Sequence, residues 1–351
     1  ICPTCVTPFP PSPVVTLHYM NSQLMKEVAE WHGARRWVVI SAAISNNILT
    51  DPYMFSIPFT VAAWKRIGWS TVVILTGKIK YWKENGMILE KACVDIDPSV
   101  RFVYFESTPE TRVSMSQITR LFAAKLLWIQ DRDLIMTSDS DILPISRTIY
   151  DQIGPEGVTI LNSDCCGNFR HSEKFPEVVM YPITNIAATK KTWVALMELE
   201  DDGVLQEQYI QTWLEEHYGN RVPTEPLTKG SDTWYIDQMA VSVQIAKHEN
   251  SIKVVKIPRS SLVDRIDRAF SHTWPSKLEH SALLNKTDAH LFMPAFDQTV
   301  WPETYNLITR MFRDEYVNSV LICWFESVSE VVRVLFDQRY IDNKIIVKRN
   351  H

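Results

Sequence analysis

The most informative segment of this chain is residues 134–144, which read Leu134-Ile135-Met136-Thr137-Ser138-Asp139-Ser140-Asp141-Ile142-Leu143-Pro144. Its first four residues form an apolar run that predicts a buried β-strand, and two carboxylates, Asp139 and Asp141, follow at once. Carboxylate oxygens are hard donors that suit Mg²⁺ or Mn²⁺, and an ion held there would neutralise the charge of a diphosphate. The Asp-x-Asp tripeptide alone is common and is usually a solvated turn, so its meaning depends on the elements around it.

Strand and helix alternate on the N-terminal side of this segment. Apolar, β-branched runs predict strands ahead of the one at 134–137, and apolar residues at helical spacing predict the helices between them. Such alternation predicts an α/β fold with a Rossmann-like, mostly parallel sheet flanked by helices. Ligands of these sheets bind beyond the carboxyl ends of the strands, where Asp139 and Asp141 are expected. The predicted strands are 36–41, 70–76 and 101–105, and the predicted helices are 56–67, 81–92 and 116–128.

The pattern becomes mixed after residue 150. We divide the chain into a proline-rich leader at 1–15, a main domain at 16–300 and a helical C-terminal extension at 301–351. The sequence leaves open whether that extension packs on the main core. The elements predicted in this half are apolar runs at 157–161 and 178–183, helices at 190–199, 204–217 and 232–246, and strands at 252–257 and 344–348.

Composition narrows the class of protein. The chain has 351 residues and a formal charge of -5 without long runs of one sign, which argues against nucleic acid or an anionic membrane as its main partner. No window approaches the roughly 20 consecutive apolar residues of a membrane span. Because the chain opens with Ile1, we expect a trimmed ectodomain whose N-terminal anchor is missing. Six cysteines and the sequon at Asn285 favour a secretory compartment with disulfides.

The helix and strand around the acidic pair resemble a block of the GT-A glycosyltransferases. In that superfamily a helix with a basic residue precedes a strand ending in Asp-x-Asp, and here Arg120 in residues 117–122 precedes Asp139-Ser140-Asp141. The resemblance implies a metal-dependent hexosyltransferase that moves a sugar from a nucleotide sugar to a glycan hydroxyl. It assigns about 35–150 as the nucleotide-binding half and about 151–300 as the acceptor half. Arg120 would face the donor diphosphate or ribose; the alternative is a solvated helix arginine.

The same resemblance assigns the remaining donor-side residues. Ser41 and Ala42 after the first strand, Tyr53 and Ser140 would contact the nucleotide, with Tyr53 as a stacking ring or a half-buried core tyrosine. Many GT-A enzymes complete the metal shell with a histidine far down the chain, and His290 is the candidate, with His272 as its competitor. A nitrogen ligand beside two carboxylates favours Mn²⁺ over Mg²⁺.

Acceptor-side residues follow from the segment 230–238. It is similar to the acidic segment of the family, and an inverting enzyme would use a carboxylate there as the base for the acceptor hydroxyl. Asp237 is preferred because it precedes Gln238, and Asp232 is the alternative, with helix capping as its other role. Trp234 and Trp274 would form a sugar platform. The family's small-residue loop is placed at Asn185–Ala188, although no glycine is present.

Several alternatives remain at this point. A sugar nucleotidyltransferase would share the sheet and acidic site, but its glycine-rich basic loop after the first strand is missing. A catalytically inactive relative of the glycosyltransferases would bind glycans through its tryptophans. The donor is expected to be UDP-galactose, then UDP-linked N-acetylglucosamine or glucose, and inversion is preferred to retention. We expect a type II protein of the Golgi lumen. The adjacent Cys165 and Cys166 are expected to find distant partners or to stay free.

Overall fold

The computed structural model describes residues 33–45, 51–173, 175–200, 203, 205–224, 227–228, 230–258, 265–268, 274–291, 297 and 299–328, without the side chains of 83–85 and 232. The predicted leader at 1–15, the strand at 344–348 and His272 lie outside this part of the chain. The side chain of Asp232 lies outside it as well.

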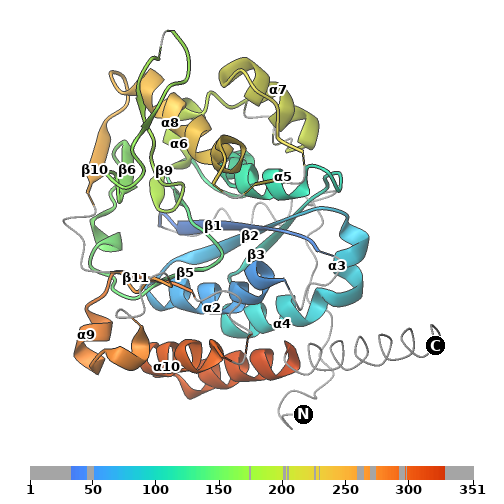
Figure 1. The fold of residues 1–351 in the computed structure, drawn as a ribbon, viewed down its shortest axis with the longest axis vertical. Coiled ribbons are helices and arrows are strands. Elements are labelled where there is room, and N and C mark those ends of the chain that lie inside the picture. Colours follow the sequence, from blue (N-terminus) through green and yellow to red (C-terminus); the bar gives the residue numbers. More distant parts are fainter. Residues whose placement is uncertain are drawn as a thin grey trace, which may run out of the picture.

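The described chain forms an α/β fold around a seven-stranded, mostly parallel sheet, as the sequence predicted (Figure 1). Its strand order is β10-β6-β9-β4-β1-β2-β3. Strands β3, β2, β1 and β4 are parallel, β9 is antiparallel to both β4 and β6, and β10 is parallel to β6. The strand bounds are β1 Arg36–Ala43, β2 Ser70–Thr76, β3 Arg101–Phe105, β4 Leu134–Thr137, β6 Val158–Leu161, β9 Ile186–Thr189 and β10 Val254–Ile257.

Helices cover both faces of the sheet (Figure 1). Alternate residues of β1 therefore enter different cores: Val38 and Ile40 pack in one cluster, and Trp37 and Val39 in the other. Burial on both faces explains why these strands read as continuous apolar runs. The first face carries α2 Pro52–Arg66, α3 Ile79–Asn85 and α4 Met87–Ile96; the second carries α5 Arg112–Ile118, the 3₁₀ helix η3 Thr119–Lys125, α6 Lys190–Leu196, α7 Glu207–His217 and α8 Ile236–His248.

Two predicted helices differ from the structure for local reasons. Helix α2 begins at Pro52 rather than near 56, because Asp51 caps it by accepting hydrogen bonds from the backbone N–H groups of Tyr53 and Met54. The helix predicted at 81–92 is split into α3 and α4 at Gly86, where a Cβ would lie 2.2 Å from the Trp82 ring. Glycine is therefore required there by the close approach of the indole.

The prediction of a loop at Asn185–Ala188 is wrong, because Ile186–Thr189 forms strand β9 in the middle of the sheet. Asn185 takes a positive φ of 68°, which supplies the left-handed turn that a glycine would have provided. The chain then runs between β4 and β6, with Ala187 facing one core and Ala188 the other. A four-residue strand of small residues lacks the long β-branched run by which the other strands are recognised.

Short elements complete the domain. Strand β5 Ile142–Pro144 pairs antiparallel with β11 Asp288–His290, and β7 Asn168–Phe169 pairs with β8 Val178–Val179. The 3₁₀ helices η4 Tyr150–Gln152, η5 Asp232–Tyr235 and η8 Pro275–Lys277 and the helix α9 His280–Leu284 connect them.

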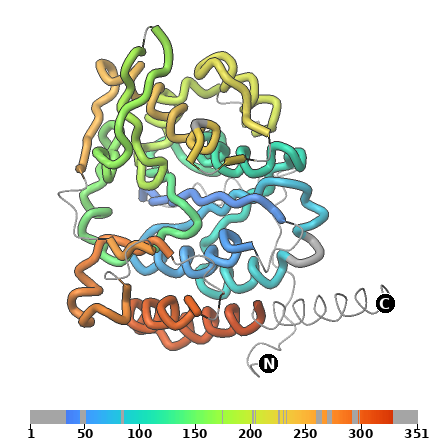
Figure 2. The backbone as a smooth tube through the Cα atoms, viewed as in Figure 1, coloured from blue at the N-terminus to red at the C-terminus, as the bar shows by residue number. Residues whose placement is uncertain are grey.

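The C-terminal helices belong to the main core. Helix α10 Trp301–Met311 and a further helix at 315–328 lie beside α2, and Figure 2 shows α10 in red along the same side of the sheet as α2 in blue. Trp324 stacks on Phe55 and donates a hydrogen bond of 2.9 Å from Nε1 to the Phe55 carbonyl. In the described part of the chain, no helix combines the length and the apolar character needed to cross a membrane.

Candidate active site

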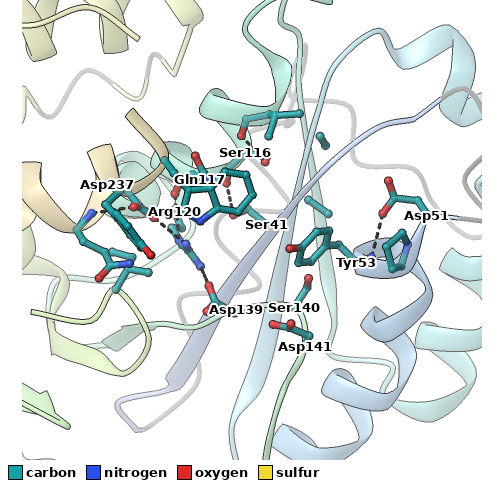
Figure 3. A pocket seen from close by; sticks show the side chains of 18 of the residues that line it. Ser41, Asp51, Tyr53, Ser116, Gln117, Arg120, Asp139, Ser140, Asp141 and Asp237 are labelled. Atoms are coloured by element: carbon teal, nitrogen blue, oxygen red, sulfur yellow. Dashed lines mark hydrogen bonds and ion pairs between the residues drawn. The ribbon is translucent and has the colours of Figure 1, made fainter. Parts of the chain in front are cut away.

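A cavity of about 500 Å³ lies at the carboxyl ends of β1 and β4 (Figure 3). The ends of β1 and β4, the first turn of α2, the α5–η3 segment and the first turn of α8 all contribute to its wall. This is the edge of a parallel sheet at which ligands are expected. The cavity brings together the predicted metal-binding, nucleotide-binding and catalytic residues whose side chains are described: Ser41, Ala42, Tyr53, Arg120, Asp139, Ser140, Asp141, Asp237 and His290.

The two aspartates that follow β4 differ in how far their side chains are exposed to solvent. Strand β4 ends at Thr137, and the Ser138 N–H then donates to the Val39 carbonyl. The Asp139 side chain is 34% exposed, whereas the Asp141 side chain is 3% exposed. The carbonyl of Ser140 accepts a 2.5 Å hydrogen bond from Thr60 Oγ1 of α2, which fixes the backbone between them. Asp139 is therefore the carboxylate that faces the open cavity.

His290 reaches Asp141 through strand pairing. In the β5–β11 ladder His290 lies opposite Ile142, the residue after Asp141. The Leu291 N–H also donates to the Asp141 carbonyl. As a result His290 Nε2 lies 3.2 Å from Asp141 Oδ2. Burial by itself raises the pKa of Asp141, but the His290 hydrogen bond and the charges of His290 and Arg268 outweigh it and leave the pKa lowered.

Arg120 is buried and contacts two carboxylates, so it is not a solvated helix arginine. Its side chain is 6% exposed, and Figure 3 shows it between Asp139 and Asp237. Its Nη1 donates to Asp139 Oδ1 at 2.5 Å and to the Ser138 carbonyl at 2.8 Å, and its Nη2 donates to Asp237 Oδ2 at 2.7 Å. Burial lowers the pKa of Arg120, but the two carboxylates outweigh this and raise it overall. The guanidinium thus stays charged inside the cavity wall.

Asp237 lies in the first turn of α8 and is buried. Its Oδ2 accepts from Arg120, and its Oδ1 accepts from the backbone N–H of Gln238 at 2.8 Å. Burial raises the pKa of this carboxyl despite the neighbouring guanidinium. Both oxygens of the predicted base therefore already have a partner within the protein.

The opposite end of the cavity is lined by the end of β1 and the start of α2. Ser41 Oγ donates to the Ser116 carbonyl, which ties β1 to α5. The Tyr53 ring lines the cavity and is partly exposed, so it is available for stacking. Burial, followed by the charge of Asp141, raises the pKa of Tyr53, so its hydroxyl stays protonated at neutral pH. A planar ring and backbone groups at this end suit a nucleobase.

Two charged residues of the cavity wall were not predicted from the sequence. Asp51 caps α2 beside Tyr53, and burial raises the pKa of its carboxyl. The pair Asp51-Pro52 is a typical helix start and was a usable signal. Arg268 donates from Nη1 to Asp141 Oδ2 at 2.9 Å. Nothing local in the sequence marks Arg268, because it comes from a segment without periodicity between β10 and β11.

The positions of the donor atoms bear on the predicted metal site. A Mn²⁺ or Mg²⁺ ion forms bonds of about 2.0–2.2 Å, so ligand atoms around one ion lie roughly 3 Å apart. The 3.2 Å between Asp141 Oδ2 and His290 Nε2 fits such an ion. Asp139 Oδ1 is instead turned onto Arg120, and among the described residues no three acidic, histidine or cysteine side chains converge. A shared ion would therefore require the Asp139 side chain to turn from Arg120 toward Asp141.

Two further predictions concern the surroundings of the cavity. Trp234 lines it, as the sugar platform requires, whereas Trp274 packs against the core cluster beside α2 and is not part of the wall. The prediction that Cys165 and Cys166 do not bond to each other is wrong, since a disulfide joins them. They lie in a tight turn between β6 and β7, in which Asn162 and Gly167 both have positive φ.

Comparison with known proteins gives distant structural likenesses only. No protein-family model matches the chain, and no curated protein matches it. Its fold is similar to the bifunctional glycosyltransferase WbbM, at 14% identity and a TM-score of 0.44, over 83% of this chain and 52% of that one. The chain thus spans about half the length of WbbM.

Two other solved structures show the same level of likeness. One is the galactosyltransferase LgtC with donor and acceptor sugar analogs, at 13% identity and a TM-score of 0.41, over 81% of this chain and 99% of that one. The other is the 4-diphosphocytidyl-2C-methyl-D-erythritol synthase of Anaerococcus prevotii. The sequence identity is 12% and the TM-score is 0.35, over 64% of this chain and 89% of that one. Glycosyltransferases are thus among the structures that this fold resembles, but similarity at this distance does not identify the reaction.

Proposed function

We propose that this protein is a metal-dependent glycosyltransferase that moves a sugar from a nucleotide sugar to a glycan hydroxyl. One observation supports the proposal above the others. The β5–β11 pairing places His290 beside Asp141, 149 residues earlier in the chain, at the edge of the sheet where Asp139 faces a cavity. Two carboxylates and an imidazole form a donor set for Mn²⁺ beside a diphosphate.

The predicted residues that line the cavity then have the following roles. Asp139, Asp141 and His290 would hold the ion, which supplies charge neutralisation to the leaving diphosphate when it is bound. Arg120 keeps Asp237 in place, would release Asp139 to the ion, and adds a fixed positive charge at that side. Tyr53, with Ser41 and Ala42, forms the nucleoside end of the cavity, and Ser140 lies between the two ends. Trp234 offers an indole face to a sugar ring.

The proposed reaction is inverting, with Asp237 as the base for the acceptor hydroxyl. Its raised pKa suits a base, but Arg120 occupies Oδ2, so the acceptor must displace that contact. This occupation favours a second candidate, a retaining transferase in which the donor phosphate takes the proton. Proton NMR of the product separates the two: an anomeric configuration opposite to that of the donor supports inversion, and an unchanged one supports retention.

The proposed donor is UDP-galactose, followed by UDP-linked N-acetylglucosamine or glucose. The deciding experiment incubates the full chain with each UDP-sugar, a mixture of glycan acceptors and Mn²⁺, and measures released UDP and the glycosylated product. The proposal expects Mn²⁺-dependent product with one of these donors. UDP-sugar binding that raises the melting temperature but yields neither UDP nor product would instead make the protein a glycan- or nucleotide-binding module.

We also propose that the protein works in the lumen of the secretory pathway, in the Golgi. The Cys165–Cys166 disulfide supports an oxidising compartment, and the sequon residue Asn285 is exposed at the end of α9. Expression of the full-length protein in secretory cells should give a glycan on Asn285, seen as a mobility shift on enzymatic deglycosylation. A protein that stays in the cytosol would contradict this assignment.

A further inference from the structure

Arg268 differs from Arg120 in how it is held. Arg120 is 6% exposed and donates to four acceptors, the carbonyls of Gln117 and Ser138 and the carboxylates of Asp139 and Asp237. Arg268 is 25% exposed and donates only to Asp141 among the described residues. One guanidinium is therefore fixed in the wall, while the other is held at one point and borders the open cavity.

The backbone that carries Arg268 is anchored beside the metal-ligand candidate. The Ile266 N–H donates to the Asp288 carbonyl, and the His290 N–H donates to the Ile266 carbonyl. Arg265, on the same segment, forms a two-point ion pair with buried Asp288, at 2.5 and 2.8 Å. The base of the Arg268 side chain is thus held in place, so a change of partner needs only rotation about its own side-chain bonds.

Arg268 and a bound ion would compete for one oxygen atom. Arg268 Nη1 lies 2.9 Å from Asp141 Oδ2, and His290 Nε2 lies 3.2 Å from the same atom. A divalent ion shared by Asp141 and His290 would need that oxygen at about 2 Å and would repel a guanidinium bound to it. Binding of the ion at that oxygen therefore weakens the contact with the guanidinium.

We propose that Arg268 is an exchangeable counter-ion: it neutralises Asp141 in the empty cavity and moves to the donor diphosphate when a divalent ion takes Asp141. The inference rests on the proposed function. A planar guanidinium binds two phosphate oxygens at once, and the diphosphate of a metal-bound nucleotide would lie within the cavity that Arg268 lines. The exchange couples the two ligands, because the ion binds weakly until a nucleotide offers the displaced arginine a new partner.

The test measures Mn²⁺ binding by the electron paramagnetic resonance signal of the free ion, with and without UDP. It uses the full chain and the variants Arg268→Gln and Arg268→Lys. Arg147→Gln is the control, because Arg147 is an exposed arginine whose ion-pair partner among the described residues is Asp151. Without UDP, Arg268→Gln is expected to bind Mn²⁺ at least about fivefold more tightly than wild type. With Mn²⁺ present, its affinity for UDP is expected to fall by at least about fivefold.

The two controls sharpen the expectation. Arg268→Lys keeps the charge and should resemble wild type in Mn²⁺ binding without UDP, while losing UDP affinity because its ammonium lacks the planar fork. Arg147→Gln should leave both titrations unchanged. Circular dichroism melts of each variant confirm that the folded protein is being compared.

The outcomes separate this inference from the proposed function. Unchanged or weaker Mn²⁺ binding by Arg268→Gln without UDP, or unchanged UDP affinity, overturns the exchange while leaving the glycosyltransferase proposal in place. A wild-type protein that binds no Mn²⁺ even with UDP present overturns the proposed metal site, and the exchange fails with it.

Discussion

At the scale of single residues, the cavity pairs each carboxylate of the acidic motif with its own cation. Arg120 neutralises Asp139, and Arg268 and His290 both face Asp141. Hydrogen bonds from these side chains offset the loss of solvation of two nearby carboxylates. Their substitution therefore tests function and stability together.

Asp141→Asn removes a charge without changing the side chain's volume. We expect Mn²⁺-dependent transfer to fall by at least about 100-fold, as on loss of a preorganised charge in an active site. Asp151→Asn is the matched control, because Asp151 is a solvent-exposed carboxylate paired with Arg36 and Arg147. Initial rates at saturating Mn²⁺, with folding verified by circular dichroism, give the comparison. Wild-type turnover in Asp141→Asn would exclude it as a metal ligand.

Another residue-scale prediction concerns Glu198, which joins the ends of α7 and α8. It contacts His217 Nδ1 at 2.7 Å and His248 Nε2 at 2.9 Å. Burial raises its pKa, but the hydrogen bond from His248 and the charges of His217, Lys247 and His248 outweigh it and lower the pKa overall. Because its side chain is 40% exposed, solvent screens this cluster, and its contribution to stability is about 0.5 kcal/mol.

The lowered pKa fixes the sign of the pH dependence. A carboxyl whose folded-state pKa is depressed stabilises the protein above its unfolded-state pKa and loses that effect as the pH falls through the folded-state value. We therefore expect Glu198→Gln to be less stable than wild type at pH 7, with the difference vanishing as the pH falls below the ordinary glutamate range. Urea unfolding of both proteins between pH 7 and pH 3 measures it, and a difference that remains undiminished at pH 3 contradicts it.

At the scale of elements, a glycine and an indole determine where one helix ends and the next begins. A Cβ on Gly86 would lie 2.2 Å from the Trp82 ring, whereas a Cβ on Gly154 would meet nothing within 4 Å. We expect Gly86→Ala to lower the free energy of unfolding by about 1–3 kcal/mol through overpacking, and Gly154→Ala to change it little. Chemical denaturation of the two variants is the measurement. Equal effects would mean that the helix break has another cause.

At the scale of the whole molecule, the C-terminal helix at 315–328 supports the part of the cavity wall that Tyr53 forms. Buried Trp324 contacts Phe55 of α2, two residues from Tyr53. We expect Trp324→Ala to cost about 3–5 kcal/mol of stability and to weaken UDP binding, because α2 loses its support. Tyr316→Ala on the same helix removes an exposed ring and should alter neither. Melting curves and UDP titrations test both, and unchanged UDP affinity in folded Trp324→Ala would separate the helix from the site.

The four parallel strands β1 to β4 and the acidic motif at the end of β4 followed from the sequence alone. A strand that is buried on both faces of the sheet consists of consecutive apolar residues, so it can be recognised from the local sequence. Two carboxylates directly after such a strand can be recognised in the same way, without knowing which other residues lie beside them. Tertiary structure decided what depends on residues far apart in the chain. The register of β5 with β11 places His290 at Asp141, and the 265–268 segment beside β11 brings Arg268 to the same oxygen. Strand β9 was missed because its small residues gain their meaning only from the neighbours between which they lie.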